Sequence, residues 1–405
     1  MSLKNKKYDA VVIGGGVIGC SVAYHLCRRG MKVALVERGD LASGTSSHCD
    51  TYAMISDKQP GKDTEQGAKS IAYLQEIAST FSYDVEVSVR GSLWITESEE
   101  EFALASDYVR KQQAAGYDLT ILNQKELLER EPYLNPSLPG GFWCAPDMSV
   151  NPYKFCFGFV VEAKKLGLDV FLYEEVRSIL RDAKGAVTGI VTDKQTIDTP
   201  TVVNCCGVWA PFIGKMVDLD IPVIPRKGVV VLSEATFPIV KQKVQEYGYM
   251  ASKFGDLSYE RKLDPEVERN NVSCVVEQTE SNNLMIGSSR NFHGISQTSE
   301  IELIRAIMRR AVYFLPILKE INCLRTYAGV RPYVDDHFPI VSGVEEVPGF
   351  YIAAGHEGDG ISLAAITGKI FTQMFFGEEA DMDMHFLRFS RFKEQVAHAP
   401  ASISS

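Results

Sequence analysis

The stretch that decides the fold is Tyr8–Glu37, which reads YDAVVIGGGVIGCSVAYHLCRRGMKVALVE. A short, mostly apolar run over 9–13 has the length of a buried parallel strand. Helical periodicity follows over 17–29, and a second apolar run over 32–36 ends at an acidic residue. A glycine-rich turn of the form G-x-G-x-x-G joins the first strand to the helix, and the acid lies about 20 residues further on. The stretch therefore predicts one β-α-β unit that binds an ADP-containing dinucleotide.

Each glycine of the turn has its own physical role. Gly14 permits the tight turn out of the strand, Gly16 lets the backbone approach a pyrophosphate, and Gly19 lets the helix pack closely on the strand. Glu37 is placed to accept hydrogen bonds from ribose hydroxyls, and its charge disfavours the 2′-phosphate of NADP. Free N–H groups and the helix dipole hold the phosphates at the start of the helix. In this chain the residues at the start of the helix include Val17 and Ile18.

The composition is that of a large globular protein. The chain has 405 residues, of which 45% are hydrophobic and 23% charged, and this length suggests two or three domains. The net charge of −10 argues against a nucleic-acid partner, because phosphate binding needs a basic face. No apolar run is long enough to predict a membrane span. The basic start MSLKNKK leads directly into the glycine-rich unit and is not a signal peptide, so a cytoplasmic location is expected.

The cysteines and histidines indicate no metal centre. The nine cysteines are odd in number and none falls in a C-x-x-C spacing, so neither a disulfide framework nor a cysteine-ligated iron–sulfur site is predicted. No histidine cluster has metal-ligand spacing, and no Ser-His-Asp set stands out. The sequence therefore predicts that the chemistry belongs to a bound cofactor.

A loop of small and hydroxylated residues, RGDLASGTSSHCD over 38–50, follows the second strand. Together with the glycine turn it resembles the D-amino-acid oxidase superfamily of FAD enzymes, which includes glycine and sarcosine oxidases. SHCD in this loop and SDKQPG over 56–61 are similar to one branch, the flavoprotein subunits of opine oxidase, hydrogen cyanide synthase and D-hydroxyproline dehydrogenase. The resemblance implies that the loop runs under the FAD pyrophosphate and along the isoalloxazine ring. The implied contacts are Arg38, Ser43, Gly44, Thr45, Ser46, Ser47 and His48.

Further segments of the chain fit the same family. In relatives, a residue at the position of Val176 meets the adenine through its backbone, and the run TVVNCCG over 201–207 passes close to the cofactor. The resemblance thus implies cofactor contacts at Val176, Cys206, Gly207, Trp209 and Gly329. Some relatives attach the flavin through a cysteine, but no cysteine follows Cys323, so non-covalent FAD is expected.

Two motifs near the C-terminus point to the substrate and the reactive ring. The segment AGVRP over 328–332 resembles the family position whose arginine binds the substrate carboxylate, and Arg331 offers the planar fork that a carboxylate fits. The alternative for Arg331 is an ion pair with Asp335 or Asp336. The segment HEGDG over 356–360 precedes a helix and, in relatives, faces the pyrimidine end of the flavin, where N–H groups stabilise the reduced ring. The implied contacts are Gly358, Asp359, Gly360, Ile361 and Ser362.

The expected architecture is α/β. An FAD-binding, Rossmann-like domain with a doubly wound parallel sheet is combined with an inserted α+β substrate domain that has an antiparallel sheet. β-branched runs with polar breaks over 221–232, 273–278 and 283–288 predict the second sheet. The predicted FAD-binding pieces are 1–84, 141–215 and 320–380, the substrate-binding pieces are 85–140 and 216–319, and 381–405 is a tail.

The family resemblance implies oxidation of the C–N bond of a small amino acid, a secondary amine, a glycine-like compound or a D-amino acid, to an imine. Arg331 would hold the carboxylate, and His48 is a candidate proton handler. The branch resemblance implies a dehydrogenase that passes electrons to iron–sulfur and NADH-oxidase-like partner subunits. The alternatives are a self-standing oxidase that forms hydrogen peroxide and a flavin-binding subunit without turnover. Tyr247, Tyr249 and Tyr259 are candidates for the substrate wall.

Overall fold

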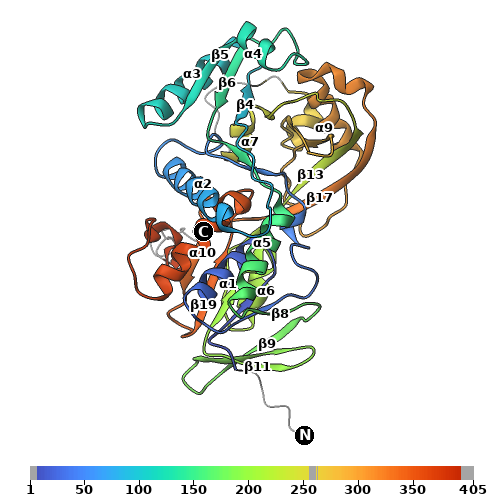
Figure 1. Cartoon of the computed structure of the whole chain (residues 1–405). Coiled ribbons are helices and arrows are strands. Elements are labelled where there is room, and N and C mark those ends of the chain that lie inside the picture. Colours follow the sequence, from blue (N-terminus) through green and yellow to red (C-terminus); the bar gives the residue numbers. More distant parts are fainter. Residues whose placement is uncertain (1–6, 255–260, 262, 394–405) are drawn as a thin grey trace, which may run out of the picture.

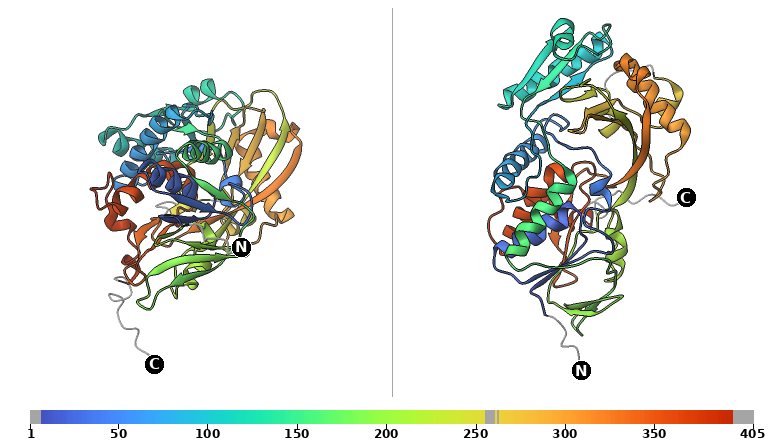
Figure 2. Two further views of the ribbon diagram at one scale, coloured as in Figure 1. Left: turned by 60° about the horizontal axis from the view of Figure 1, so that its bottom comes forward. Right: turned by 45° about the vertical axis from the view of Figure 1, so that its right-hand side comes forward.

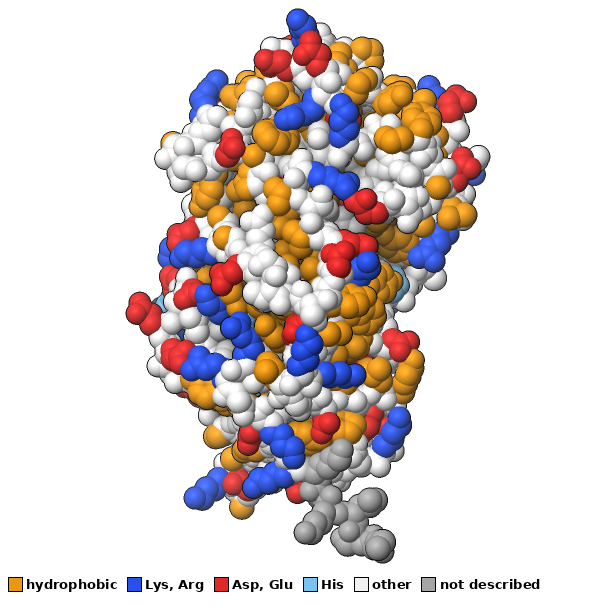
Figure 3. All heavy atoms as spheres, in the orientation of Figure 1, with side chains coloured by type: hydrophobic (Ala, Val, Ile, Leu, Met, Phe, Trp, Pro, Cys, Tyr) orange, Lys and Arg blue, Asp and Glu red, His pale blue; other side chains and the backbone are white. Residues whose placement is uncertain are grey.

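The computed structural model describes residues 7–254, 261 and 263–393. Two large sheets make up the two halves of the molecule, and the chain passes between them several times (Figures 1 and 2). The six-stranded sheet occupies the lower half of Figure 1, and the eight-stranded sheet occupies the upper half. On the face drawn in Figure 3, acidic and basic side chains are interspersed. Among the helices of the described residues, none has both the length and the apolar character that crossing a membrane requires.

The six-stranded sheet begins with the predicted β-α-β unit. Its first and second strands pair in parallel, and the strand after residue 201 pairs in parallel on the other side of the first. The strand order is β18-β19-β12-β1-β2-β8, and only the β18–β19 pair in this order is antiparallel. The strands are β1 (Ala10–Ile13), β2 (Val33–Val36), β8 (Asp169–Phe171), β12 (Val202–Asn204), β18 (Ile340–Gly343) and β19 (Phe350–Ala354).

Strands of this sheet are apolar on both sides because both faces are covered. Val12 and Leu35 pack under helices, whereas Val11 and Val36 pack against a small antiparallel sheet. The helices are α1 (Val17–Arg28), α2 (Lys62–Thr80), α5 (Pro152–Lys165) and α10 (Gly360–Phe375). The small sheet contains β9 (Val176–Arg181), β10 (Val187–Thr192) and β11 (Thr196–Asp198), and α6 (Ala210–Lys215) lies beside it. β9 and β10 pair as an antiparallel hairpin.

The eight-stranded sheet has the order β17-β13-β16-β15-β14-β4-β6-β5. All of its pairs are antiparallel except β14 with β4. Its strands are β4 (Ser92–Ile95), β5 (Leu119–Asn123), β6 (Gly140–Cys144), β13 (Ile224–Ala235), β14 (Lys243–Glu246), β15 (Val275–Gln278), β16 (Asn283–Gly287) and β17 (Cys323–Tyr333).

The two faces of the eight-stranded sheet differ in what they contact. Val229, Val231, Val276 and Ile286 share one face with a core cluster that includes residues of α9 (Ile301–Phe314). Because strand side chains alternate, the neighbouring positions point to the opposite face. That opposite face lines the cavity described below and has glycines and charged residues at several positions.

The remaining elements connect these layers. Asn123 caps a short helix with a capping box, and Pro152 begins α5. These elements are α3 (Glu99–Ala114), α4 (Gln124–Arg130), α7 (Tyr249–Phe254), α8 (Pro265–Arg269), β3 (Tyr52–Ala53), β7 (Met148–Ser149) and the 3₁₀ turns Thr45–Ser47, Gly207–Trp209, Pro316–Glu320 and Met384–Leu387.

The α/β class with a second, largely antiparallel sheet is confirmed by this arrangement. The predicted domain bounds stay a prediction, but two strands that fall in or at the edge of the predicted FAD-binding pieces pair within the eight-stranded sheet. β17 falls inside the predicted third FAD-binding piece, yet it pairs along its length with β13. β6 begins at the predicted return to the FAD-binding domain and pairs with β4 and β5. Both strands therefore extend from the predicted FAD-binding pieces into the sheet of the predicted substrate domain.

Candidate active site

A cavity of about 550 Å³ lies between the two sheets. Segments from the beginning, middle and end of the chain line it. Most of the predicted site residues meet there, namely Gly14, Gly16, Val17, Ile18, Glu37, Arg38, Ser43, Gly44, Thr45, Ser46, His48, Val176, Cys206, Gly207, Trp209, Gly329, Arg331, Gly358, Gly360 and Ile361.

The glycine turn leaves no room for side chains. Gly14 has a φ of +108°, and a Cβ there would lie 2.7 Å from the carbonyl oxygen of Cys205. A Cβ on Gly19 would lie 1.9 Å from the carbonyl oxygen of Gly14. The helix therefore starts directly behind the turn, with its first N–H groups at the cavity. Val17 N donates to Ser46 Oγ at 3.0 Å, which places the serine loop beside the start of α1.

The carboxylate of Glu37 is held in place by the backbone. Gly15 N donates to Oε2 at 2.7 Å, and Gly39 N donates to Oε1 at 2.8 Å. The Arg38 guanidinium carbon lies 4.4 Å from the centre of the Trp209 ring. This end of the cavity thus offers a fixed acid and an aromatic surface, a combination that suits a ribose and its base.

The loop after the second strand lies between the two sheets. Thr45 Oγ1 donates to Val330 O at 2.6 Å. A Cβ on Gly329 would lie 2.2 Å from the carbonyl oxygen of His48, so β17 must have glycine where the loop crosses it. His48 Nδ1 lies 2.9 Å from Gly44 O, which orients the imidazole within the loop.

Arg331 lies on the cavity face of β17. Its Nη1 donates to Ser289 O at 3.0 Å, and its guanidinium covers Gly228, where a Cβ would lie 2.4 Å from Nη1. Burial and the neighbouring Arg290 lower the pKa of Arg331, because a cation is less stable in a low-dielectric site beside like charge. An anionic ligand would compensate both effects.

The alternative prediction for Arg331 is wrong. Asp336 pairs with Arg391, whose Nε lies 2.6 Å from its Oδ2. No ion pair joins Arg331 to Asp335 or Asp336, all three of which are described. β17 turns Arg331 to the cavity, whereas Asp336 follows the end of the strand and contacts the C-terminal segment.

The HEGDG segment places the start of α10 at the cavity. Gly358 lies beside Arg331, and Gly360 and Ile361 begin the helix. Burial lowers the pKa of His356 to about 3, so its imidazole is neutral, and Nε2 lies 3.0 Å from Thr367 Oγ1. The unpaired N–H groups of the helix start favour negative charge in front of them.

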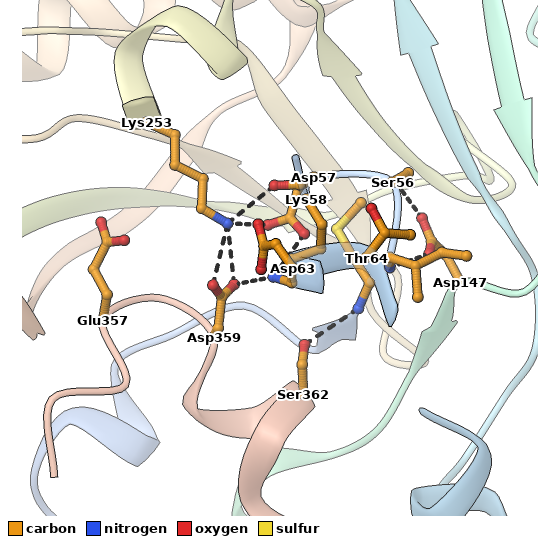
Figure 4. A network of polar contacts seen from close by, with 12 residues as sticks. Ser56, Asp57, Lys58, Asp63, Thr64, Asp147, Lys253, Glu357, Asp359 and Ser362 are labelled. Atoms are coloured by element: carbon orange, nitrogen blue, oxygen red, sulfur yellow. Dashed lines mark hydrogen bonds and ion pairs between the residues drawn. The ribbon is translucent and has the colours of Figure 1, made fainter. Parts of the chain in front are cut away.

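A buried ion network stands behind this helix start (Figure 4). Lys253 Nζ lies 2.8 Å from Asp57 Oδ2 and 3.2 Å from Asp359 Oδ2. Lys58 Nζ lies 2.6 Å from Asp359 and 2.9 Å from Asp57. Figure 4 shows the two lysines and two aspartates converging from the loop before α2, from α7 and from the HEGDG segment. The network therefore fixes the loop that leads into α10.

Four predicted cofactor contacts do not line the cavity. Gly19 packs against the glycine turn, and Ser47 Oγ donates to Gly44 O within its own loop. Asp359 belongs to the ion network, and Ser362 Oγ accepts from Met54 N at 3.2 Å. These residues support the residues that line the cavity, and their predicted contact with a cofactor stays a prediction.

The sequence interpretation missed several residues that line the cavity. Glu277 projects from β15 and Met285 from β16, where the two residues pair directly. Asp50 and Glu357 lie within recognised segments but were not singled out. One signal in the sequence could have indicated this wall of the cavity, because Glu277 is the one charged residue of a largely apolar strand. Other missed lining residues are Glu174, Phe212, Gly228, Val230 and Ser288.

The three candidate tyrosines have different positions. Tyr249 lines the cavity, and the Arg290 guanidinium carbon lies 4.0 Å from the centre of its ring. Tyr247 packs against the hydrophobic core. Tyr259 lies outside the described residues.

The cavity thiols are not activated. Cys49, Cys205 and Cys206 line the cavity, and burial raises the pKa of each thiol, which keeps it protonated. Cys323 is exposed and is not among the cavity residues. These features support non-covalent cofactor binding, which stays a prediction. Within the described residues, no group of His, Cys, Asp or Glu side chains is arranged to hold a metal ion.

The chain's own residues fit FAD. The side-chain-free turn, the fixed acid and the helix start suit an ADP group, and the part of the cavity lined by residues of β13 and β17 suits a ring system.

Comparisons with known proteins agree with this fit. The chain is 26% identical over 400 residues to glycine oxidase of Bacillus subtilis (strain 168), an alignment that covers 96% of this chain and 99% of that protein. It is 24% identical to the hydrogen cyanide synthase subunit HcnC of Pseudomonas aeruginosa, covering 97% and 98% of the two chains. It is also 27% identical to glycerol 3-phosphate dehydrogenase of Caloramator mitchellensis, covering 88% of this chain and 71% of that one.

Solved structures share the fold. Glycine oxidase from Geobacillus kaustophilus has a TM-score of 0.83 at 23% identity, with 95% of this chain and 99% of that one covered. L-proline dehydrogenase from P. horikoshii has a TM-score of 0.84 at 23% identity, with 96% and 99% covered. The family described as FAD dependent oxidoreductase, DAO, matches residues 9–374. This protein therefore belongs to the DAO family of FAD-dependent oxidoreductases.

Proposed function

We propose that this enzyme oxidises the C–N bond of a small amino acid, a secondary amine, a glycine-like compound or a D-amino acid, to an imine. The observation that carries the proposal is Arg331, whose guanidinium lies in the cavity beside Gly358, next to the start of α10. A carboxylate bound there in a bidentate manner would be fixed in direction as well as position. The glycine oxidase relatives support an amino-acid substrate.

The proposed roles of the residues follow from their positions. FAD supplies the hydride acceptor when it is bound. Arg331 holds the substrate carboxylate, Gly228 leaves room for the Arg331 guanidinium, Gly329 leaves room for the His48 backbone, and the start of α10 stabilises negative charge. Positioning provides most of the rate acceleration. Water then hydrolyses the imine to an oxo acid or aldehyde and to ammonia or an amine.

We propose further that the enzyme is a dehydrogenase that passes electrons to iron–sulfur and NADH-oxidase-like partner subunits. Two relatives are themselves named as parts of larger enzymes, HcnC and one of the subunits of the anaerobic glycerol-3-phosphate dehydrogenase of Escherichia coli (strain K12). The glycine oxidase relatives favour the second candidate, a self-standing oxidase. The proposed location is the cytoplasm, because unpaired cysteines suit a reducing compartment.

Anaerobic mixing of the FAD-loaded enzyme with sarcosine, glycine, D-proline, an opine or glycerol 3-phosphate tests these proposals. Bleaching of the flavin by an amine, followed by re-oxidation with a dye faster than with oxygen, is the expected result. Rapid oxygen consumption would favour the oxidase. Reduction by glycerol 3-phosphate alone would contradict an amine substrate. Failure of every compound would favour a flavin-binding subunit without turnover.

The role of Arg331 is tested by substitution. Arg331→Ala should lower the ratio of reduction rate to substrate dissociation constant by about 100-fold, since a charged hydrogen bond contributes about 1.5–3 kcal/mol. Arg331→Lys should recover part of the loss, because it keeps the charge but not the fork. Arg325→Ala is the matched control, as Arg325 lies on the same strand but is exposed. Equal effects of the changes at 331 and 325 would contradict the proposed anchor.

A further inference from the structure

A buried carboxyl group lines the cavity from the sheet side. Glu277 on β15 is 2% exposed. Thr51 N donates to its Oε1 at 2.9 Å. Among the described residues, its Oε2 has no hydrogen-bond partner. Buried polar atoms are nearly always paired, so an unpartnered oxygen on a carboxyl group whose residue lines a cavity indicates a proton on that group or a ligand close to it.

The hydrogen bond to Thr51 connects this carboxyl to the cofactor loop. His48, Cys49 and Asp50 precede Thr51, and all three line the same cavity. The sheet register places Met285, another lining residue, directly beside Glu277. Glu277 therefore belongs to the same chamber as Arg331, although it projects from a different strand.

Charged and titratable groups from several neighbouring elements interact with Glu277. Lys243 lies on the adjacent strand β14, and its Nζ is 2.6 Å from Asp50 Oδ2. Tyr52 of β3 and Tyr327 of β17 both interact electrostatically with Glu277. The remaining neighbour on the loop is Cys49, which interacts with Tyr327.

Of these neighbours, several keep one protonation state around neutral pH. Burial raises the pKa of Tyr52, Tyr327 and Cys49, so these groups stay protonated. The pKa of Lys243 is raised too, because Asp50 and Glu277 outweigh its burial, so the ammonium stays charged. Burial and the nearby Asp50 raise the pKa of Glu277 to about 7, against the opposing effect of Lys243. Glu277 can thus change its protonation state at neutral pH.

The proposed reaction releases a proton that needs an acceptor. A substrate ammonium ion, R–NH₂⁺–CHR₂, must lose one N–H proton to become the neutral amine. The neutral amine then loses its C–H hydrogen with both bonding electrons to the cofactor and becomes an iminium ion, which water hydrolyses. A group that accepts the N–H proton works best when its pKa lies near the operating pH.

We propose that Glu277 is the proton acceptor of this cavity, taking the N–H proton of the substrate ammonium before hydride transfer. This inference rests on the proposed amine oxidation. The carboxylate form of Glu277 binds the proton at the unpartnered Oε2, while Thr51 N holds Oε1 in place. Lys243 and Asp50 form a charged pair beside Glu277, and both charges act on its carboxyl group. After turnover the proton leaves to solvent and restores the carboxylate.

The test compares Glu277→Gln with a matched control elsewhere in the protein. Glu131 is a second buried carboxyl whose pKa burial raises to about 7, but it accepts from Lys241 N at 2.8 Å and does not line the cavity. Glu131→Gln therefore removes an equivalent titration outside the site. Glu277→Asp keeps a carboxyl group on a shorter chain.

Anaerobic flavin reduction by the best amine substrate is measured from pH 5.5 to 9.5. In the natural enzyme and in Glu131→Gln, the ratio of rate to dissociation constant should rise through a transition near pH 7. In Glu277→Gln the transition should disappear and the value at pH 8 should fall at least about 100-fold. Glu277→Asp should recover part of the rate. An unchanged pH profile in Glu277→Gln would overturn the inference while leaving the proposed function intact.

A second readout does not depend on turnover. The absorbance spectrum of the bound flavin should change with a midpoint near pH 7 in the natural enzyme and in Glu131→Gln, and should not change in Glu277→Gln. A transition that persists in Glu277→Gln would also overturn the inference. Lack of reduction of the natural enzyme by any amine, with the spectral result as expected, would instead contradict the proposed function.

Discussion

At the scale of single residues, space is the strictest requirement of this site. A Cβ on Gly19 would lie 1.9 Å from the carbonyl oxygen of Gly14, a contact that only backbone movement can relieve. We expect Gly19→Ala to move α1 away from β1, to lower the free energy of unfolding by about 1–3 kcal/mol, and to weaken FAD binding. Titration of the apoprotein with FAD and urea unfolding measure the two effects. Gly67→Ala is the control, because its Cβ would meet only ordinary contacts at 3.4 Å or more.

Single residues also show what the sequence could not reveal. Gly14, Gly19 and Glu37 could be assigned because the roles of a glycine turn depend on short spacings along the chain. Glu277 could not be assigned, because its exposure to the cavity depends on the pairing of β15 with β16 and on Thr51, a residue far away in the sequence. The sequence shows a charge in an apolar strand but not the side to which it points.

At the scale of elements, the ion network behind α10 joins three parts of the chain. Burial alone would raise the pKa of Asp57, but Lys253 and Lys58 lower it well below its usual range. A carboxyl whose pKa is depressed in the folded state contributes stability above its unfolded pKa of about 4 and loses it as the pH falls. We expect the free energy of unfolding to fall steeply below pH 4.

The variant Asp57→Asn tests this linkage. It should cost about 3 kcal/mol at pH 7, because two buried lysines lose a partner, and its stability should depend less on pH between 2 and 4. Urea unfolding at several pH values provides the measurement. The exposed pair of Lys62 with Asp383 offers the control, since Asp383→Asn should change the stability by less than about 1 kcal/mol. Equal losses for both variants would contradict the importance of burial.

The elements that the sequence predicted well were those with local signals. The first β-α-β unit has such signals in its apolar runs and its glycine turn. β17 falls in the predicted FAD-binding piece 320–380, although its AGVRP motif resembles the family position that binds the substrate carboxylate. Its strand partner is β13, however, and such long-range pairing leaves no trace in a single sequence.

At the scale of the whole molecule, the cavity is the place where both sheets meet. Residues from each sheet line it, so a ligand that fills it contacts both. We expect FAD at 100 times its dissociation constant to stabilise the folded protein by about 2.7 kcal/mol. A single cooperative thermal transition should shift to higher temperature. FMN, which lacks the ADP group, should shift it less, and equal shifts would contradict the assignment of the glycine turn.

The spread of the cavity residues along the chain has a consequence for synthesis. The lining begins at Ile13 and ends at Ile361, and β19, which pairs with β12 near the centre of the six-stranded sheet, spans Phe350–Ala354. A growing chain on the ribosome lacks one wall of the site until Ile361 has been made. Cofactor loading must therefore follow the synthesis of that wall, so cells that make this protein faster than they supply FAD will accumulate apoprotein whose site is formed but empty.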